Sequence, residues 1–303
     1  MTALFDRLVV TTLPLVPRAL VKRVAARYVA GETLDAALAT VRALAAEGAM
    51  ATLDILGERV TRREQTEAMR GQYLRVIDAI AASGLDANVS VKPSAVGLAI
   101  DPALALDNCT DICARAAAHG MFVRLDMEDS PFTESTLRLA LELKAKFPAV
   151  GVAIQAYLKR SLRDLDRLIA ARMNVRICKG IYVEPRTIAW KERRAVIDSF
   201  GALVDKQLEA GCYAGIATHD EACVQHALAT IDRLRLGPDR YEFQMLLGVD
   251  PVLRRSLLDA GHRLRVYVPF GGDWYAYSTR RLKENPSIAR YVIRATLGLG
   301  PAA

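Results

Sequence analysis

Residues 122–157 read FVRLDMEDSPFTESTLRLALELKAKFPAVGVAIQAY, and they contain the pattern that decides the fold. Two short runs rich in apolar residues, FVRLDMED (122–129) and VGVAIQAY (150–157), flank a stretch with helical periodicity, PFTESTLRLALELKAKF (131–147). Near-continuous apolar runs of this length predict parallel strands that are covered on both faces. The stretch therefore predicts a strand–helix–strand unit.

The same alternation repeats along the chain. The other runs are MATLDILGE (50–58), NVSVKPSA (88–95), NVRICKG (174–180), YAGIATH (213–219), YEFQMLLG (241–248) and HRLRVYVPFG (262–271). Eight such units in 303 residues predict a (β/α)8 TIM barrel, an α/β fold for which about 250 residues is typical. We expect residues 1–45 to form extra helices packed outside, and residues 46–303 to form the barrel within a single-domain protein.

Composition excludes membrane-spanning and secreted classes of protein. The mean hydropathy is +0.14, and no stretch approaches the roughly 18 to 20 apolar residues of a membrane span. The N-terminal apolar run LVVTTLPLV (8–16) is broken by Pro14 and is not followed by a small-residue cleavage site, which favours mature protein over a signal peptide. An amphipathic segment that touches a membrane surface or a partner chain is the alternative.

Charge, cysteine usage and histidine spacing indicate which partners and which cellular compartment to expect. The net charge is +7, but Lys and Arg are dispersed without the aromatic interleaving of nucleic-acid modules, so no nucleic-acid partner is expected. Five cysteines without a CxxC motif predict buried free thiols in a reducing, cytoplasmic compartment. The four histidines show no metal-ligand spacing, so no metal is expected.

Polar or reactive side chains close nearly every predicted strand. They are Asp54, Glu58, Lys92, Ser94, Asp126, Glu128, Gln155, Tyr157, Arg176, Lys179, Thr218, His219, Gln244 and Tyr267. In a parallel barrel the carboxyl ends of all strands meet at one mouth, where the active sites of this fold lie. The pattern therefore predicts an active site. Because the chain has neither GxGxxG nor a P-loop, a dinucleotide here would need side chains and strand-end amides.

A short predicted helix, DWYAYSTRRLKENP (273–286), carries an unusual polar stripe. Tyr277, Arg280, Arg281 and Glu284 have the spacing i, i+3, i+4 and i+7, which is one helical face. Two adjacent guanidiniums suit a carboxylate or a phosphate. With Lys92, Arg176 and Lys179 they outnumber the acidic groups predicted at the mouth, so an anionic ligand is expected. A solvated face, with Glu284 screening the arginines, is the alternative.

Nine motifs in chain order resemble those of the proline dehydrogenase family, the FAD-dependent enzymes of proline catabolism. They are DILGE (54–58), VSVKPSA (89–95), LDMED (125–129), IQAY (154–157), VRICKGIY (175–182), ATHD (217–220), FQMLLG (243–248), VYVPFG (266–271) and YSTRRLKE (277–284). The resemblance covers about residues 45 to 295, and the size is that of the monofunctional bacterial form.

The resemblance implies a role for each motif. In the family the last helix lies over the barrel mouth, which makes the barrel a distorted one. The substrate-binding residues implied are Arg280, Arg281 and Lys92 on the proline carboxylate, Asp126 orienting Lys92, and Tyr182, Leu246, Tyr267 and Tyr277 around the ring. Glu58 would pair with Arg280 as a gate. The residues implied to hold FAD are Gln155, Arg176, Lys179, Gly180, Thr218, His219, Gln244 and Glu284.

The activity that the resemblance implies is the oxidation of L-proline to 1-pyrroline-5-carboxylate, by hydride transfer to flavin N5. A membrane quinone would receive the electrons, which implies a transient contact with the inner face of the cell membrane. A pyrroline-5-carboxylate dehydrogenase would be a partner. A different class stays open, because barrel-mouth lysines also serve as Schiff-base nucleophiles in aldolases, and Lys92 and Lys179 are candidates.

Local sequence adds three expectations. Leu247 stands where the family has a histidine or another polar or aromatic residue, so contacts near the pyrophosphate differ here. The loop between Tyr267 and Tyr277 is about two residues shorter than in bifunctional relatives. Pro93 pushes the backbone of Lys92 into an extended conformation, which suits a strand end.

Overall fold

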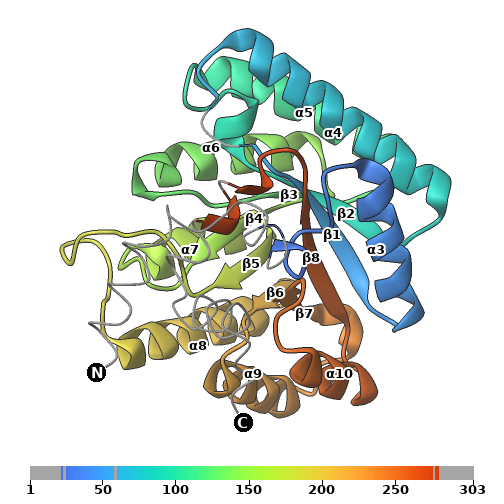
Figure 1. The fold of residues 1–303 in the computed structure, drawn as a ribbon. Coiled ribbons are helices and arrows are strands. Elements are labelled where there is room, and N and C mark those ends of the chain that lie inside the picture. Colours follow the sequence, from blue (N-terminus) through green and yellow to red (C-terminus); the bar gives the residue numbers. More distant parts are fainter. Residues whose placement is uncertain (1–21, 23–24, 58–59, 276, 280–303) are drawn as a thin grey trace.

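The barrel predicted from the sequence is confirmed by the computed structural model, which describes residues 22, 25–57, 60–275 and 277–279. Eight parallel strands close into one barrel, and β1 pairs with β8 from Met50↔Arg265 to Ile55↔Phe270 (Figure 1). The strands are β1 Met50–Ile55, β2 Ala87–Val91, β3 Val123–Leu125, β4 Val150–Gln155, β5 Asn174–Cys178, β6 Ala214–Ala217, β7 Tyr241–Leu246 and β8 Leu264–Phe270.

Helices surround the barrel, one before the first strand and the others between successive strands. They are α3 Leu34–Ala46, α4 Arg63–Ser83, α5 Pro102–Ala118, α6 Ser130–Lys146, α7 Ser161–Ala170, α8 Arg193–Glu209, α9 Glu221–Leu234 and α10 Pro251–Asp259, with short 3-10 turns at Pro93–Val96 (η2) and Pro238–Arg240 (η3). Every predicted strand is present, but each ends one to four residues earlier than its run. After Val91, for example, Pro93 begins a 3-10 turn because it has no N–H to donate to a strand neighbour.

Aspartates start the helices that follow two of the strands. Asp101 precedes Pro102 at the start of α5, and its side chain accepts a hydrogen bond from the N–H of Ala103. Asp220 does the same for Ala222 at the start of α9. These caps satisfy N–H groups that the first helical turn leaves free, so the chain turns sharply from strand to helix.

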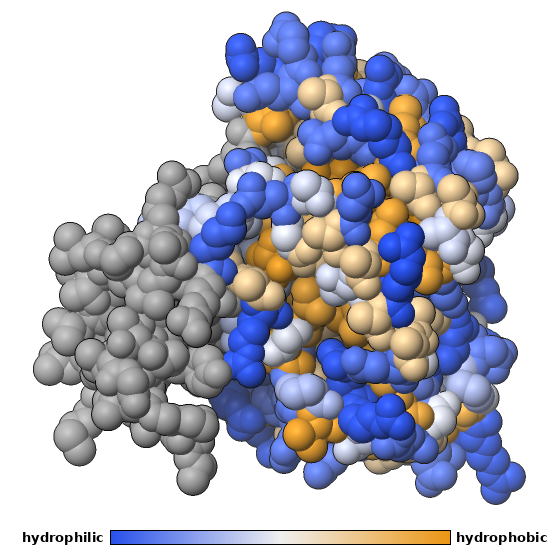
Figure 2. Space-filling model, turned by 45° about the vertical axis from the view of Figure 1, so that its right-hand side comes forward, coloured by the Kyte–Doolittle hydropathy of each residue, from blue (hydrophilic) through white to orange (hydrophobic). Residues whose placement is uncertain are grey.

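Helix α3 takes the place that the eighth helix has in a regular barrel. It begins after Thr33, whose side chain accepts a hydrogen bond from Ala36 N, and it packs on both β1 and β8. Ala37, Leu38, Val41 and Leu44 form its buried face. Its outer face belongs to a surface on which hydrophilic side chains are interspersed with smaller apolar areas (Figure 2). The seam between the first and last strands is therefore covered by residues that precede the barrel.

The interior of the barrel is polar, which the sequence patterns did not predict. The buried polar strand residues include Thr52, Asp54, Asn88, Ser90, Arg124, Gln155, Arg176, Glu242, Gln244 and Arg265. They alternate with buried apolar residues such as Leu53, Val89, Leu125, Ile177 and Val266. Since successive side chains on a strand point to opposite faces, one face meets the helices and the other meets a hydrogen-bonded interior. The expectation of near-continuous apolar strands was therefore wrong for the inner face.

Charged side chains of this interior have hydrogen-bond partners on other strands. Arg265 donates from Nε to both carboxylate oxygens of Glu242, at 3.0 Å each. Arg124 donates to the backbone and side-chain oxygens of Asn174, both at 2.7 Å. Gly151 makes this approach possible, because a Cβ there would lie 2.3 Å from the Asn174 carbonyl oxygen and 2.7 Å from the Arg124 guanidinium. Burial lowers the pKa of Arg124 to about 9, with Arg176 acting in the same direction.

The segment before α3 crosses the upper end of β8. Ala30 N donates to the carbonyl oxygen of Pro269, at 2.9 Å, and Gly271 N donates to that of Gly31, at 3.0 Å. Val29, Leu56 and Tyr277 form a small apolar cluster there, with Trp274 against it. Within the described part of the chain, no helix is both long and apolar enough to cross a bilayer.

We predict that the buried face of α3 stabilises the closed barrel. Leu44 is buried against the barrel wall, so Leu44→Ala should lower the free energy of unfolding by about 2–5 kcal/mol through lost burial and the cavity left behind. Urea unfolding followed by circular dichroism measures the difference. Arg42 is exposed on the same helix, and Arg42→Ala should change stability by less than about 0.5 kcal/mol. Equal midpoints for both variants would show that α3 is not part of the barrel's cooperative unit.

Candidate active site

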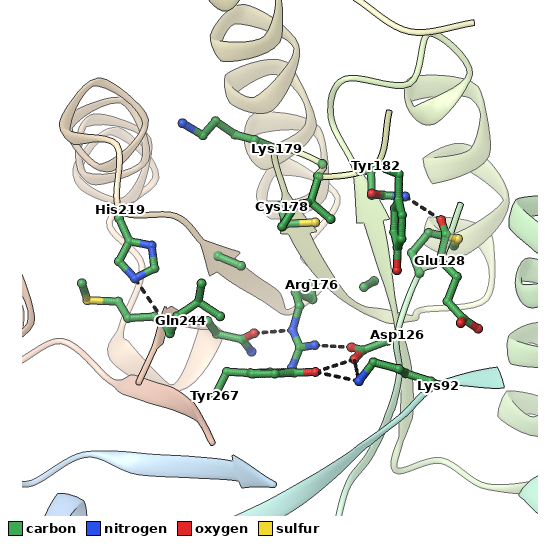
Figure 3. Close-up of a pocket in the computed structure, with 18 of the residues that line it drawn as sticks. Lys92, Asp126, Glu128, Arg176, Cys178, Lys179, Tyr182, His219, Gln244 and Tyr267 are labelled. Atoms are coloured by element: carbon green, nitrogen blue, oxygen red, sulfur yellow. Dashed lines mark hydrogen bonds and ion pairs between the residues drawn. The ribbon is translucent and has the colours of Figure 1, made fainter. Parts of the chain in front are cut away.

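A cavity of about 240 Å³ lies at the carboxyl ends of the strands, where the sequence predicted the active site. Its lining includes Lys92, Asp126, Glu128, Gln155, Arg176, Cys178, Lys179, Gly180, Tyr182, His219, Gln244, Leu246, Tyr267 and Tyr277 (Figure 3). Of the predicted site residues that the structure describes, only Thr218 is not part of this lining, and it lines the adjoining cavity. The barrel topology thus brings together residues that are far apart in sequence.

Arg176 is the central residue of the site. It lies on β5 and is 7% exposed. Its Nε donates to Gln244 Oε1 at 2.5 Å, and its second nitrogen donates to Asp126 Oδ1 at 2.5 Å (Figure 3). The same nitrogen also donates to Ser90 Oγ at 3.0 Å. Gln244 Nε2 in turn donates to Glu242 at 2.5 Å, which connects the site to the charged pairs below it. The guanidinium is therefore held in one orientation by partners on three strands or strand ends.

Tyr267 joins the two cations of the cavity floor. Its hydroxyl donates to Asp126 Oδ2 at 3.0 Å and accepts from Lys92 Nζ at 3.3 Å (Figure 3). The guanidinium carbon of Arg176 lies 5.4 Å from the centre of the Tyr267 ring. Burial, Asp126 and Asp54 raise the pKa of Tyr267 well above its usual value, so the hydroxyl stays protonated and keeps donating.

Lys92 has a closer carboxylate partner than the one expected from the resemblance. Its Nζ donates to Asp54 Oδ1, whereas the nearest oxygen of Asp126 is 4.0 Å away. Its backbone is extended, with φ −83° and ψ 117°, as the following Pro93 predicts. Lys92 thus lies between two carboxylates, and Asp126 is bonded mainly to Arg176.

The pKa values of the two carboxyl groups, Asp126 and Asp54, are shifted in opposite directions. Burial would raise the pKa of Asp126, yet Arg176 and Lys92 hold it below its usual value. Burial raises the pKa of Asp54 to about 6, and Lys92 opposes this only in part. Asp54 is fully buried, and its Oδ2 has no hydrogen-bond partner among the described residues. One ionised carboxylate and one that titrates near neutrality therefore surround the Lys92 ammonium group.

Aromatic and aliphatic side chains form the upper wall of the cavity. Tyr182 comes from the connection after β5, and Leu246 is the last residue of β7. Tyr277 is 6% exposed, and its N–H donates to the carbonyl oxygen of Asp273 at 3.3 Å, as in the first turn of a helix. These side chains and the charged floor line the same cavity.

A second cavity, of about 460 Å³, adjoins the first and shares part of its wall. Thr218, His219 and Asp220 line it at the start of α9. His219 Nε2 accepts a hydrogen bond from Leu246 N at 3.0 Å, so the ring lies in the wall between the cavities. Lys179 points away from the charged floor and donates to Asp220 Oδ2 at 2.9 Å (Figure 3).

Gly180 is required for the shape of this wall. Its φ is +104°, which favours glycine, and a Cβ there would lie 2.0 Å from the ring of Tyr157. Gln155 on the neighbouring strand is buried, and its Nε2 donates to the carbonyl oxygen of Glu128 at 2.9 Å. Both residues thus help to fix the side of the cavity formed by β4 and β5.

Four predicted site residues lie outside the described part of the chain: Glu58, Arg280, Arg281 and Glu284. Their roles, and the position of the last helix over the mouth, stay predictions. The helix that would carry three of them begins at Trp274 within the described residues, and Tyr277 already lines both cavities.

Sequence reasoning did not assign a role to Asp54, to Cys178 or to Tyr28. Asp54 was noticed only as a polar residue near a strand end. Cys178 is half-buried and lines the first cavity, unlike the other four cysteines, which are buried free thiols. Tyr28 lines the second cavity from the segment before α3. In the sequence, no hydrophobic periodicity indicated that this segment lies near the mouth of the barrel.

Comparison with known proteins gives a consistent picture. A family model described as "Proline dehydrogenase" matches residues 37–294. The chain is 38% identical over 278 residues to a protein of Deinococcus radiodurans named "Proline dehydrogenase", with 90% of each chain covered. It is 35% identical over 273 residues to "Proline dehydrogenase 1" of Bacillus subtilis subsp. natto, again with 90% of each covered.

Solved structures show the same fold at lower identity. The structure of proline utilization A from Bdellovibrio bacteriovorus, inactivated by N-propargylglycine, superposes with a TM-score of 0.83 at 22% sequence identity. The match covers 92% of this chain and 34% of that one, so this chain spans about a third of that larger protein. The likeness supports the barrel architecture described above.

We predict that Asp54 makes stability fall as the pH rises through the range 4 to 6. Because the folded-state pKa is raised from 3.8 to about 6, the unfolded chain releases this proton first, which favours unfolding over that range. The variant Asp54→Asn lacks this titration. The wild type should therefore lose on the order of 2–3 kcal/mol relative to the variant between pH 4 and pH 7.

Urea unfolding of both proteins at half-unit pH steps measures that difference. Asp78→Asn is a matched control, because the Asp78 side chain is 46% exposed and its pKa is lowered by Arg115, so its contribution to stability has the opposite sign. If the difference between wild type and Asp54→Asn stays constant from pH 4 to pH 7, Asp54 is ionised throughout and the burial argument fails.

Proposed function

The chain belongs to the proline dehydrogenase family of enzymes, and we propose that it oxidises L-proline to 1-pyrroline-5-carboxylate with the help of bound FAD. The observation that carries the proposal is the first cavity, where a rigidly bonded floor that contains Lys92 and Arg176 faces an aromatic wall. Proline has the matching shape, with a carboxylate at one side of a small apolar ring. The floor supplies cations for the carboxylate and the wall supplies contacts for the ring.

Lys92 is the described cation best placed to receive the substrate carboxylate. It is 6% exposed and lines the cavity floor, and Tyr267 lies beside it. Arg280 and Arg281 would complete the clamp, as the resemblance implies. A charge-assisted clamp fixes the ring in one orientation, which is the main contribution that a protein makes to such a reaction.

The residues around the two cavities fit a flavin dinucleotide. The cavities adjoin each other and share Lys179, Gly180, His219 and Leu246, so a long ligand could extend through both. The start of α9, next to Thr218, presents helical N–H groups that suit a pyrophosphate. Gln155, Arg176 and Gln244 supply amide and guanidinium groups at the deep end. We propose that these residues hold FAD, together with Glu284.

When bound, the flavin supplies a two-electron acceptor for the hydride that leaves the ring carbon next to the proline nitrogen. The protein's own groups prepare the substrate for this loss. Lys92 and Arg176 are themselves fixed by Asp54 and Asp126, so the floor would hold the ring in one orientation.

The electron acceptor and the consumer of the product are further parts of the proposal. We propose a membrane quinone as the acceptor and a pyrroline-5-carboxylate dehydrogenase as the partner that consumes the product. One relative at 28% identity is named "Bifunctional protein PutA", and this chain covers 24% of it. A Schiff-base aldolase is disfavoured, because two carboxylates beside Lys92 stabilise the ammonium form, which cannot attack a carbonyl.

Spectroscopy of the purified protein under anaerobic conditions tests the proposal. A flavin band near 450 nm should bleach on addition of L-proline and stay unchanged with D-proline, because the clamp and the wall fix one face of the ring. A coloured protein that L-proline does not bleach would require another substrate. A colourless protein that takes up no added FAD would refute the flavin.

We predict that Lys92→Met raises the KM for L-proline about 30- to 900-fold, which corresponds to the ~2–4 kcal/mol lost when a buried carboxylate lacks its cation. Initial rates with a soluble dye as acceptor measure the change. Lys146→Met is the control, since Lys146 is exposed on α6 and pairs only with Glu142 among the described residues. The control should leave KM unchanged. An unaltered KM in Lys92→Met with normal flavin content would remove Lys92 from the carboxylate site.

A further inference from the structure

The turn that follows Lys92 is attached to the neighbouring strand end by one carboxylate. The turn is η2, Pro93–Val96, and all four of its residues are buried. Within it the N–H of Ser94 donates to Glu128 Oε2 at 2.8 Å, and the Ser94 hydroxyl donates to Oε1 at 2.5 Å. Glu128 lies three residues after the end of β3, is 5% exposed and lines the first cavity (Figure 3). These two contacts therefore join the chain beyond β2 to the chain beyond β3.

The segment that carries Glu128 is itself fixed in place. Asp126 N donates to the carbonyl oxygen of Val91 at 2.9 Å, which extends the pairing of β2 and β3 by one residue. The Asp126 side chain is bonded to Arg176. Gln155, on β4, donates from Nε2 to the carbonyl oxygen of Glu128 at 2.9 Å. The backbone on both sides of the Glu128 carboxylate is thus held by the barrel.

Lys92 lies between the floor of the cavity and this turn. Its ammonium group lies between the carboxylates of Asp54 and Asp126, and its carbonyl oxygen accepts from Ala95 N at 3.0 Å. A flexible four-carbon stem separates the ammonium group from the backbone, so contacts at the tip do not fix the main chain. A shift of the turn would move the base of the side chain. Displacement of a binding group by about 1 Å can cost on the order of a hundredfold in activity.

We propose that Glu128 is a positioning residue that, through Ser94, holds Lys92 where a substrate carboxylate can meet it. The inference deepens the proposed function and rests on it, because it concerns the same carboxylate site. The role requires two hydrogen bonds rather than a negative charge. A glutamine can make both, since its oxygen can accept from the Ser94 N–H and its NH2 can donate to the hydroxyl oxygen, which accepts as well as donates.

Initial rates of the holoenzyme with L-proline and a soluble dye test this role. Glu128→Met keeps the length of the side chain but has no acceptor oxygen. Its KM should rise about tenfold to a hundredfold, while kcat at saturating proline changes by less than about threefold. Glu128→Gln should keep both constants within about threefold of the wild type. If Glu128→Gln raises KM as much as Glu128→Met, the charge is what matters and positioning by hydrogen bonds is refuted.

A double variant tests whether Glu128 acts through Lys92. When Lys92→Met is already present, Glu128→Met should raise KM no further, because the group that Glu128 positions has been removed. The double variant should therefore have the KM of Lys92→Met alone. If the two increases in KM multiply instead, Glu128 acts independently of Lys92 and the proposal is wrong.

Glu184→Met is the matched control. Glu184 is also buried, and it accepts from the N–H and the hydroxyl of Ser130 at 2.6 and 2.7 Å, so it makes the same pair of contacts as Glu128. It lines neither of the two cavities of the site, and its replacement should leave KM unchanged. An equal rise in KM in both variants would show a general loosening of the mouth and would overturn the specific role of Glu128.

Ser94→Ala covers the case in which Glu128→Met does not hold flavin. It removes only the hydroxyl donor, and its KM should rise about threefold or more. An unchanged KM in Ser94→Ala would contradict the proposal.

Binding of tetrahydro-2-furoic acid, a ring-oxygen analogue of proline, separates this inference from the reaction itself. The flavin spectrum follows the binding. If Glu128→Met weakens binding of the analogue but the wild type does not oxidise proline, the proposed function fails and the positioning role stands. If the wild type oxidises proline and Glu128→Met binds the analogue normally, the positioning role fails and the proposed function stands.

Discussion

The ion pair between Arg176 and Asp126 is the contact on which the rest of the site depends. Both groups are almost completely removed from water, and a buried charge without its partner costs several kcal/mol. Each therefore has further partners, with Gln244 and Ser90 on Arg176, and Tyr267 on Asp126. A network of this kind has one low-energy arrangement, which is why the cavity floor is fixed before any ligand arrives.

The same constraint extends through the barrel. A TIM barrel is usually filled by branched apolar side chains, whereas here much of the interior is polar. Glu242 shows how this is sustained. Burial would raise its pKa, but Arg265 and Arg124 hold it below the usual value, so it stays ionised and keeps Arg265 paired. The apolar packing of the strands is therefore mainly on their outer faces, which contact the helices. In a regular barrel both faces of the strands pack apolar side chains.

The architecture could be predicted from the sequence because β-branched runs and helical periodicity are local signals. The strands were predicted to extend too far. In the sequence Lys92 and Pro93 look like a continuation of the strand, whereas in the structure Pro93 begins a 3-10 turn. The polar interior was missed because Arg124 and Arg265 alternate with apolar residues, and an average over the run hides this. Among site residues, Asp54 could not be assigned to Lys92 without the strand register that places Asp54 beside Ser90. The roles of Glu58 and of the arginines of the last helix still rest on the resemblance to the family alone.

The position of α3 has a consequence for how the chain folds. The helix ends at Ala46, yet one of the two strands it covers, β8, begins only at Leu264. On a ribosome the helix emerges early and is followed directly by β1, but almost the whole chain must be made before β8 can cover the rest of its apolar face. Contacts with so large a separation in sequence slow folding and expose apolar surface in intermediates. Closure of the β1–β8 seam is therefore a late step, and the amphipathic helix is the segment that most needs protection until then.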